Sequence, residues 1–283
     1  MNVQTVTSER KELVTVTGKR KRLFKFKGTV LGPVLAFIAF LSLWQLIPLL
    51  FGIAPFILPK PTDVIQAALE NWTLLSPAIQ ITLGEAIIGF LLSAIIGIFV
   101  SVLLASSRIL EISIYPYAII LQTIPVVAIA PIIVIWFGSG FNSIVIISFI
   151  FGLFPIISNT LMGLNSVDKN MQELFTLYNA SKWQSMWKLR IPAALPYITA
   201  GLKVSSTLTI LGAITGEYIA GIGGGKGGLG YAITVAAVQL KTPYLFACGI
   251  ASAIFGIVFY LLVSYLSNML LKSWHESAMK VEK

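Results

Sequence analysis

Charged side chains are scarce in this sequence. Only 11% of its 283 residues are Asp, Glu, Lys or Arg, whereas 57% are hydrophobic. In ordinary soluble domains roughly a quarter of the residues are charged and roughly half are hydrophobic. So few charges cannot cover the surface of a water-soluble protein of this length. The composition therefore indicates a chain whose main solvent is the lipid bilayer.

Cysteine and histidine are nearly absent as well. Cys248 is the single cysteine and His275 the single histidine, which excludes an intrachain disulfide and leaves no cluster of soft metal ligands. No Ser or Cys in the apolar segments is paired by spacing with a base, so the sequence does not predict a hydrolase. We expect no catalytic residue, metal or cofactor site in this chain.

Long apolar segments are abundant. A spanning helix needs about 20 mostly apolar residues, and the segments that meet this length are 29–51, 79–106, 112–137, 142–165, 193–220 and 243–271. Prolines and glycines inside them are tolerated where neighbouring helices satisfy the freed backbone groups. We expect an all-α membrane protein with six transmembrane helices, some of them kinked, in one domain at 29–271 between polar tails at 1–28 and 272–283.

The distribution of Lys and Arg predicts the orientation. Eight of the 20 basic residues lie in the first 28 positions. With the N-terminus in the cytoplasm, 16 fall on the inner side, three (Lys60, Lys226 and Lys241) fall on the outer side, and Lys203 lies near the inner start of the fifth span. Cytoplasmic loops carry the excess of basic residues, so both ends are predicted to be cytoplasmic. The net charge of +9 then needs no nucleic-acid partner.

A short polar segment at 61–70 separates the first two spans. Its apolar residues recur at helical spacing, and Thr62 is a candidate N-cap. We expect a short amphipathic helix along the outer membrane surface.

The longest polar segment on the inner side is 167–192. Asp168 is a candidate N-cap for a helix that runs to about Tyr178. Asn179 is a candidate stop, because Asn adopts the left-handed conformation more readily than other residues with a side chain.

A second helix is predicted directly afterwards. Ser181 and Gln184 have the spacing of a capping box, and the helix should reach about Arg190. Pro192 lacks a backbone N–H and restricts Ile191. We therefore expect the chain to turn at Pro192 before the fifth span.

Four residues of this second helix share one face at helical spacing: Trp183, Met186, Trp187 and Arg190. Such a face favours docking to a partner. Packing against the inner ends of the chain's own spans, or against lipid headgroups where Trp is common, explains it equally well.

Ionisable side chains inside spans usually face a cavity or a partner. Glu85 and Glu217 could line a pathway or its outer gate, but both lie near outer ends, so local pairing is the favoured interpretation. Gln122 and Thr123 of the third span are weaker pathway candidates. The Gly-rich run 223–228 contains G-x-G-x-x-G, yet no strand precedes it, so it predicts an outer loop rather than a nucleotide site.

The inner segment resembles the cytoplasmic signature of bacterial importer permeases, E-A-A, three residues, G, nine residues, then I-x-L-P. This chain has Glu173-Leu174-Phe175, Asn179 and Leu189-Arg190-Ile191-Pro192 at the same spacing. The stretches PVVAIAPIIVIWFGSG and SKWQ are similar to permeases of the nitrate, sulfonate and taurine type. Leu174, Phe175 and Asn179 depart from the signature, which affects the docking geometry more than the fold.

The resemblance implies the type I fold of ATP-binding-cassette (ABC) importer permeases, with six spans and a cytoplasmic coupling helix, in a bacterial-type inner membrane. It implies three partners: cytoplasmic ATPase subunits, which alone use ATP, a second permease chain, taken here to be a second copy, and an external solute-binding protein. The residues implied in ATPase coupling are Glu173, Asn179, Ser181, Trp183, Trp187 and Pro192. The substrate would be a small anion such as a sulfonate, taurine or nitrate, or a pyrimidine, thiamine precursor or riboflavin.

Two other functions compete with an importer permease. A proton-coupled secondary transporter could use Glu85 and Glu217, but it predicts inverted repeats, and the two halves of the sequence show no convincing one. A purely structural membrane scaffold is the other alternative, but such a function gives no reason for kinked spans.

Overall fold

The computed structural model describes residues 28–220 and 227–274. Helix is the only regular structure in these residues, so the predicted all-α class is confirmed for them. The basic tail, most of the Gly-rich run and His275 lie outside the described residues. The elements are α2 (Gly28–Leu50), α3 (Pro61–Glu70), α4 (Trp72–Ser106), α5 (Arg108–Thr123), α6 (Val126–Phe137), α7 (Phe141–Asn165), α8 (Lys169–Leu177), α9 (Lys182–Ser185), the π-helical turn η1 (Met186–Arg190), α10 (Ile191–Ala220), α11 (Leu229–Val238) and α12 (Thr242–Trp274).

Five continuous helical segments are long and apolar enough to cross a membrane: Leu31–Leu50, Trp72–Ser106, Phe141–Asn165, Lys182–Ala220, which joins α9, η1 and α10, and Thr242–Leu271. The predicted span at 112–137 is not one helix. It is divided between α5 and α6 at Pro125, which has extended backbone angles (φ −60°, ψ 114°) and cannot donate the hydrogen bond that would continue a helix. The count of six crossing segments therefore stays a prediction.

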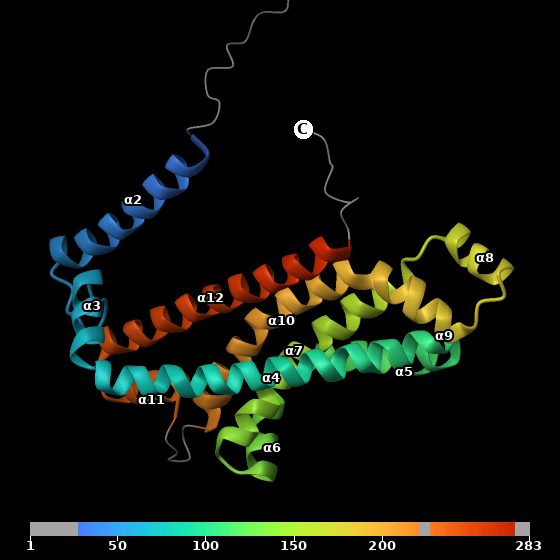
Figure 1. Cartoon of the computed structure of the whole chain (residues 1–283). Helices are drawn as coiled ribbons and strands as arrows, with labels where there is room; N and C mark the ends of the chain where they lie inside the picture. The colour runs from blue at the N-terminus through green and yellow to red at the C-terminus, as the bar shows by residue number, and fades with distance from the viewer. Residues whose placement is uncertain (1–27, 221–226, 275–283) are drawn as a thin grey trace, which may run out of the picture.

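The centre of the molecule is α7, which packs between α4 and α10 (Figure 1). Small residues allow this close approach, as at Gly152, where a Cβ atom would lie 2.5 Å from Thr209 Cγ2. Hydroxyl groups link the helices across the same layer: Ser93 Oγ donates to the Phe149 carbonyl (2.7 Å) and Ser148 Oγ to the Thr209 carbonyl (2.8 Å). Small residues and short polar side chains at helix crossings are typical of membrane bundles.

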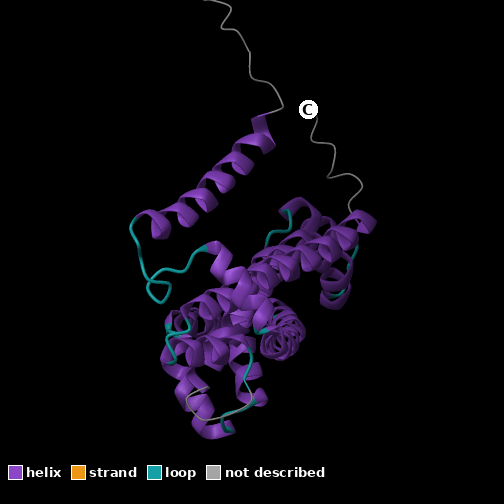
Figure 2. Ribbon diagram, turned by 90° about the vertical axis from the view of Figure 1, so that its left-hand side faces the viewer, coloured by secondary structure: helices purple, strands orange, loops and turns teal. Residues whose placement is uncertain are grey.

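The first apolar helix, α2, lies apart from this bundle in both views (Figure 1 and Figure 2). Its apolar side chains are almost all exposed. Trp44 holds its C-terminal half, donating from Nε1 to the Pro59 carbonyl (3.0 Å) and stacking on Phe246 of α12 with ring centroids 5.8 Å apart. So much exposed apolar surface requires lipid or another protein around it.

The predicted helix at 61–70 is confirmed as α3, but Thr62 is not its N-cap. Lys60 is the N-cap and Pro61 the first helical residue. The Asp63 carboxylate accepts from the Lys60 backbone N–H (3.2 Å). Proline is favoured at the first helical position because its missing N–H needs no partner there, and this moves the cap one residue before it. The position of α3 along a membrane surface stays a prediction.

Candidate functional site

The first helix of the inner segment, α8, is capped as predicted. Asp168 Oδ1 accepts from the Asn170 backbone N–H (2.7 Å). At the other end, the Ala180 N–H donates to the Phe175 carbonyl (3.0 Å) and the Asn179 N–H to the Thr176 carbonyl (2.9 Å). This is the Schellman arrangement, and Asn179 takes the left-handed conformation that it requires (φ 51°). Asparagine therefore supplies the turn that glycine makes in the signature.

No residue of α8 is buried. The helix projects from one end of the bundle (Figure 1). Its apolar side chains are open to solvent, and Leu177 and the adjoining Tyr178 are each 79% exposed. Glu173 is exposed next to Leu174 and forms no ion pair among the residues that the structure describes. Caps thus stabilise α8 locally, while its faces remain uncovered.

The predicted capping box of the second helix is confirmed. Ser181 Oγ accepts from the Gln184 backbone N–H (3.2 Å), and Gln184 Oε1 accepts from the Ser181 backbone N–H (2.8 Å). Both orphan donors at the start of α9 are therefore satisfied.

The predicted turn at Pro192 is wrong. The chain stays helical through α9, η1 and α10, and Ile191 has helical backbone angles (φ −63°, ψ −48°). The Ile191 N–H donates to the Met186 carbonyl, five residues back. A π-helical turn shifts the hydrogen-bond register. Pro192 therefore stands at the start of α10, where the helix tolerates a residue without a backbone N–H.

The predicted four-residue face is also divided. Met186 is 4% exposed and packs among apolar residues of α4, α7 and α10, whereas Trp183 and Trp187 are 67% and 53% exposed. The two Trp rings meet edge to face, with centroids 5.6 Å apart. Met186 lies on the side of the helix that meets the bundle, and the two Trp residues lie on the side that does not.

The Arg190 side chain is half-buried and makes three hydrogen bonds within the protein. Its Nε donates to the Leu164 carbonyl (3.0 Å), its Nη1 to the Ala105 carbonyl (2.7 Å) and its Nη2 to Asn165 Oδ1 (2.7 Å). Asn165 in turn donates from Nδ2 to Glu111 Oε1 (2.7 Å). One guanidinium thereby joins the C-terminal ends of α4 and α7 to the start of α10, where unsatisfied carbonyls favour a cation.

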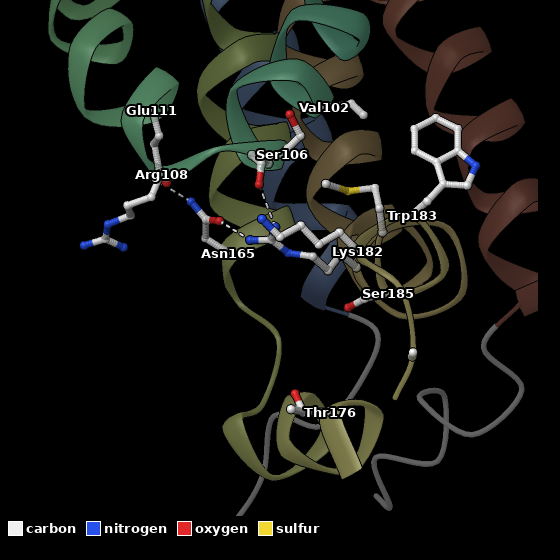
Figure 3. Close-up of a pocket in the computed structure, with 13 residues that line it drawn as sticks. Val102, Ser106, Arg108, Glu111, Asn165, Thr176, Lys182, Trp183 and Ser185 are labelled. Atoms are coloured by element: carbon white, nitrogen blue, oxygen red, sulfur yellow. Dashed lines mark hydrogen bonds between the residues drawn. The ribbon is translucent and has the colours of Figure 1, made fainter. Parts of the chain in front are cut away.

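A cavity of about 430 Å³ lies between this anchor and α8 and α9 (Figure 3). Its polar lining includes Arg108, Glu111 and Lys182. We refer to it as the basic cavity.

A second polar cluster lies at the other end of the bundle and contains Glu217. The Glu217 carboxylate accepts from Thr82 Oγ1 (2.6 Å) and from the Gly230 backbone N–H (2.6 Å), while Thr82 Oγ1 accepts from the Leu229 N–H (2.8 Å). Glu217 and Thr82 therefore cap the start of α11. A Cβ atom on Gly228 would overlap both side chains, which explains why the Gly-rich run ends in glycine.

Glu85 lies beside this cap and is 1% exposed, as is Glu217. Its Oε2 has no hydrogen-bond partner among the residues that the structure describes, and it lines a cavity of about 160 Å³ together with Gly140 and Tyr231. The Glu217 carboxyl lines the same cavity. The local pairing favoured from sequence describes Glu217 well but leaves one oxygen of Glu85 unsatisfied.

Gln122 and Thr123 are exposed at the C-terminal end of α5, where Thr123 Oγ1 donates to the Ile120 carbonyl (2.7 Å). They do not line the cavity that contains Glu85. The structure thus separates the candidate pathway residues into two groups.

Sequence reasoning missed the anchoring role of Arg190 and its partners Asn165 and Glu111. Arg190 lies 26 and 85 positions after the two carbonyls that it bonds, so helical spacing gives no signal for either contact. Nothing local identified which helix ends it would reach.

Comparison with known proteins finds one family and several relatives that are all components of transport systems. Residues 93–272 match the family described as binding-protein-dependent transport system inner membrane component. The formylaminopyrimidine transport permease protein ThiX of Halalkalibacterium halodurans is 33% identical, over 85% of this chain and 95% of that protein. The riboflavin transport system permease protein RibX of Chloroflexus aurantiacus is 32% identical over 93% and 97%. The putative aliphatic sulfonates transport permease protein SsuC of Bacillus subtilis is 30% identical over 91% of each.

Proposed function

Because this chain belongs to the family of inner-membrane components of binding-protein-dependent transport systems, we propose that it forms the translocation pathway of an ABC importer and couples it to a separate ATPase. Membership confirms the resemblance noted at Glu173–Pro192 and makes the chain a multi-pass membrane transport protein. The observation that carries the coupling proposal is the contrast between an uncovered helix, α8, and the anchored turn beside it.

The ATPase docks on α8. This helix is capped at both ends and has no buried residue, so most of its surface is free to contact a partner. Exposed apolar side chains next to Glu173 offer the mixture of apolar and charged contacts that protein interfaces use. Asn179 and Ser181 form the turn that sets the angle between α8 and α9.

Arg190 transmits the movement of the docked helix. Three charge-assisted hydrogen bonds tie η1 to the ends of α4 and α7, and α10 continues directly from η1. A displacement of α8 and α9 therefore pulls on three long helices at once. ATP binding by the partner would shift the helices between two arrangements because the partner contacts α8 differently in its two states.

Glu85 and Glu217 form the outer end of the pathway in this proposal. Glu217 holds α11 against α4 and α10, and the unpartnered Glu85 oxygen lines a small cavity beside it. Opening that cavity would expose a carboxyl to the solute. Gln122 and Thr123 contribute where the pathway passes the break between α5 and α6.

A second copy of this chain completes the pathway. The apolar side chains of α6 support this, since Ile135 and Trp136 are 78% and 74% exposed at a helix that projects from the bundle (Figure 1). An external solute-binding protein delivers the solute on the side of Glu85. Both termini lie in the cytoplasm, in agreement with the positive-inside distribution.

The solute is small and comes from one of two classes. Relatives are named for formylaminopyrimidine and riboflavin transport and for aliphatic sulfonates. The Glu85 carboxyl lines the small cavity beside Glu217 and can accept a hydrogen bond from an N–H group, which favours a nitrogen heterocycle with N–H donors.

Reconstitution tests the proposal. The chain is purified with the ATPase encoded beside it, and ATP hydrolysis and solute uptake are measured in liposomes with and without the neighbouring binding protein. Uptake should require ATP, and hydrolysis should rise with loaded binding protein. Uptake that follows a proton gradient without any ATPase would instead identify a secondary transporter.

A further inference from the structure

An apolar groove opens beside the two exposed Trp rings. It has a volume of about 570 Å³ and is lined by α4 from Ala94 to Leu103, by Trp183 and Trp187, and by Ile191 and Ile198 of α10. Ala94 and Leu103 are nine residues apart, about 14 Å along a helix. That is close to the depth of one leaflet, since the hydrocarbon core is about 30 Å thick.

The apolar groove continues into the basic cavity. Val102, Ser106 and Trp183 line both. A ligand in the two together would place an apolar chain along α4 and a polar head at the level of Trp183, and Trp favours the membrane interface.

The basic cavity keeps two unneutralised cations. Glu111 is bound through Asn165 to the guanidinium of Arg190, and Arg190 makes three hydrogen bonds with groups of the protein. Arg108 and Lys182 are exposed and form no ion pair within the described residues. The cavity is therefore complementary to an anionic group.

We propose that the apolar groove and the basic cavity together bind one anionic phospholipid, with an acyl chain along α4 and the phosphate between Arg108 and Lys182. The lipid fills the gap between α9 and α4 and stiffens the connection between the coupling segment and the bundle. This site is separate from the cavity that contains Glu85, and of α8 only Thr176 lines it.

A second groove provides an internal comparison. It has a volume of about 350 Å³ and lies between α10 and α12, where it is lined by Ile214, Ala253 and Tyr260, among others, and by no charged residue. Lipids should occupy it without preference for their headgroup.

Native mass spectrometry of the full chain, with the subunits it retains, tests the site. The complex is mixed with phosphatidylglycerol or phosphatidylcholine of identical acyl chains. One phosphatidylglycerol should stay bound at collision energies that remove phosphatidylcholine. The Arg108→Gln/Lys182→Gln variant should weaken phosphatidylglycerol binding roughly thirtyfold, since each basic residue near a membrane surface contributes on the order of 1 kcal/mol.

Matched control variants distinguish binding at this site from a general effect of removing positive charge or adding side-chain volume. Lys188→Gln/Lys241→Gln removes two exposed cations that line neither cavity and should change nothing. Ala94→Phe fills the apolar groove and should release the lipid, whereas Ala253→Phe fills the comparison groove and should not. Glycerol 3-phosphate should not displace the lipid.

Three outcomes would overturn the proposal. Equal retention of the two lipids, or equal loss in both charge variants, would show that no specific headgroup site exists. Displacement by glycerol 3-phosphate would identify a site for a free phosphate ester. Loss of a second permease copy or of the ATPase with Ala94→Phe, without loss of lipid, would assign the groove to a protein contact.

Discussion

The two halves of the coupling segment differ in how they are held. The first half, α8, is stabilised by its own caps and has no buried residue. The second half, α9 with η1, buries Met186 and Leu189 and is tied to distant helices by Arg190. A helix that holds its shape without the bundle is suited to binding a partner, while a turn bonded to several helices is suited to moving them. The comparison separates docking from transmission.

The largest expected effect follows from removing the anchor. Arg190→Ala leaves two helix-end carbonyls and Asn165 without their charged donor, and hydrogen bonds to charged groups contribute about 1.5–3 kcal/mol each. We expect ATP-driven uptake to fall at least tenfold while the ATPase still co-purifies. Arg190→Lys keeps the charge but cannot reach three acceptors, so its uptake should be intermediate. Normal uptake in Arg190→Ala would remove the transmission role.

The two buried carboxyls should respond in opposite directions. Glu217→Gln weakens the cap on α11 and should lower the free energy of unfolding by about 1–3 kcal/mol. Glu85→Gln replaces a carboxyl that has an unsatisfied oxygen and should leave stability unchanged or raise it, while lowering uptake. Thermal unfolding of the purified variants, alongside uptake, measures both. A large loss of stability in Glu85→Gln would mean that its carboxyl is a structural group.

Substitutions at Asn179, in the turn between the two halves, should have a smaller effect than those at Arg190, Glu217 or Glu85. Asn179 has φ 51°, a conformation that costs an ordinary residue roughly 1–2 kcal/mol. Asn179→Ala should therefore fray the end of α8, seen as faster amide exchange over 174–180, and weaken ATPase binding several-fold. Asn179→Gly should exchange at the wild-type rate. Equal exchange in the two variants would show that the left-handed turn does not limit the order of α8.

Much of this segment could be predicted from local sequence, because its caps involve residues two to five positions apart. Asp168, Asn179 and the Ser181–Gln184 box all behave as their residue types indicate. The π turn could not be predicted, since the proline rule assumes an α-helical register at Pro192.

Contacts between residues far apart in the sequence could not be predicted in this way. Arg190 bonds residues 26 and 85 positions earlier, and Thr82 and Glu217 meet across 135 positions. Helical spacing placed Arg190 on a face with two Trp residues, but only the packed bundle determines that its side chain turns inward. Pro125 marks the break between α5 and α6, but an apolar run of sufficient length predicts a span whether or not it contains a proline.

One measurement tests the separation of docking from transmission most directly. A Glu173→Ala/Leu177→Ala variant of α8 and the Arg190→Ala variant are each purified from membranes together with the ATPase, and the amount of bound ATPase and the solute imported per ATP hydrolysed are determined. We predict that the α8 variant loses the ATPase, whereas Arg190→Ala retains it and hydrolyses ATP with little uptake. Retention of a fully coupled ATPase by the α8 variant would contradict this account.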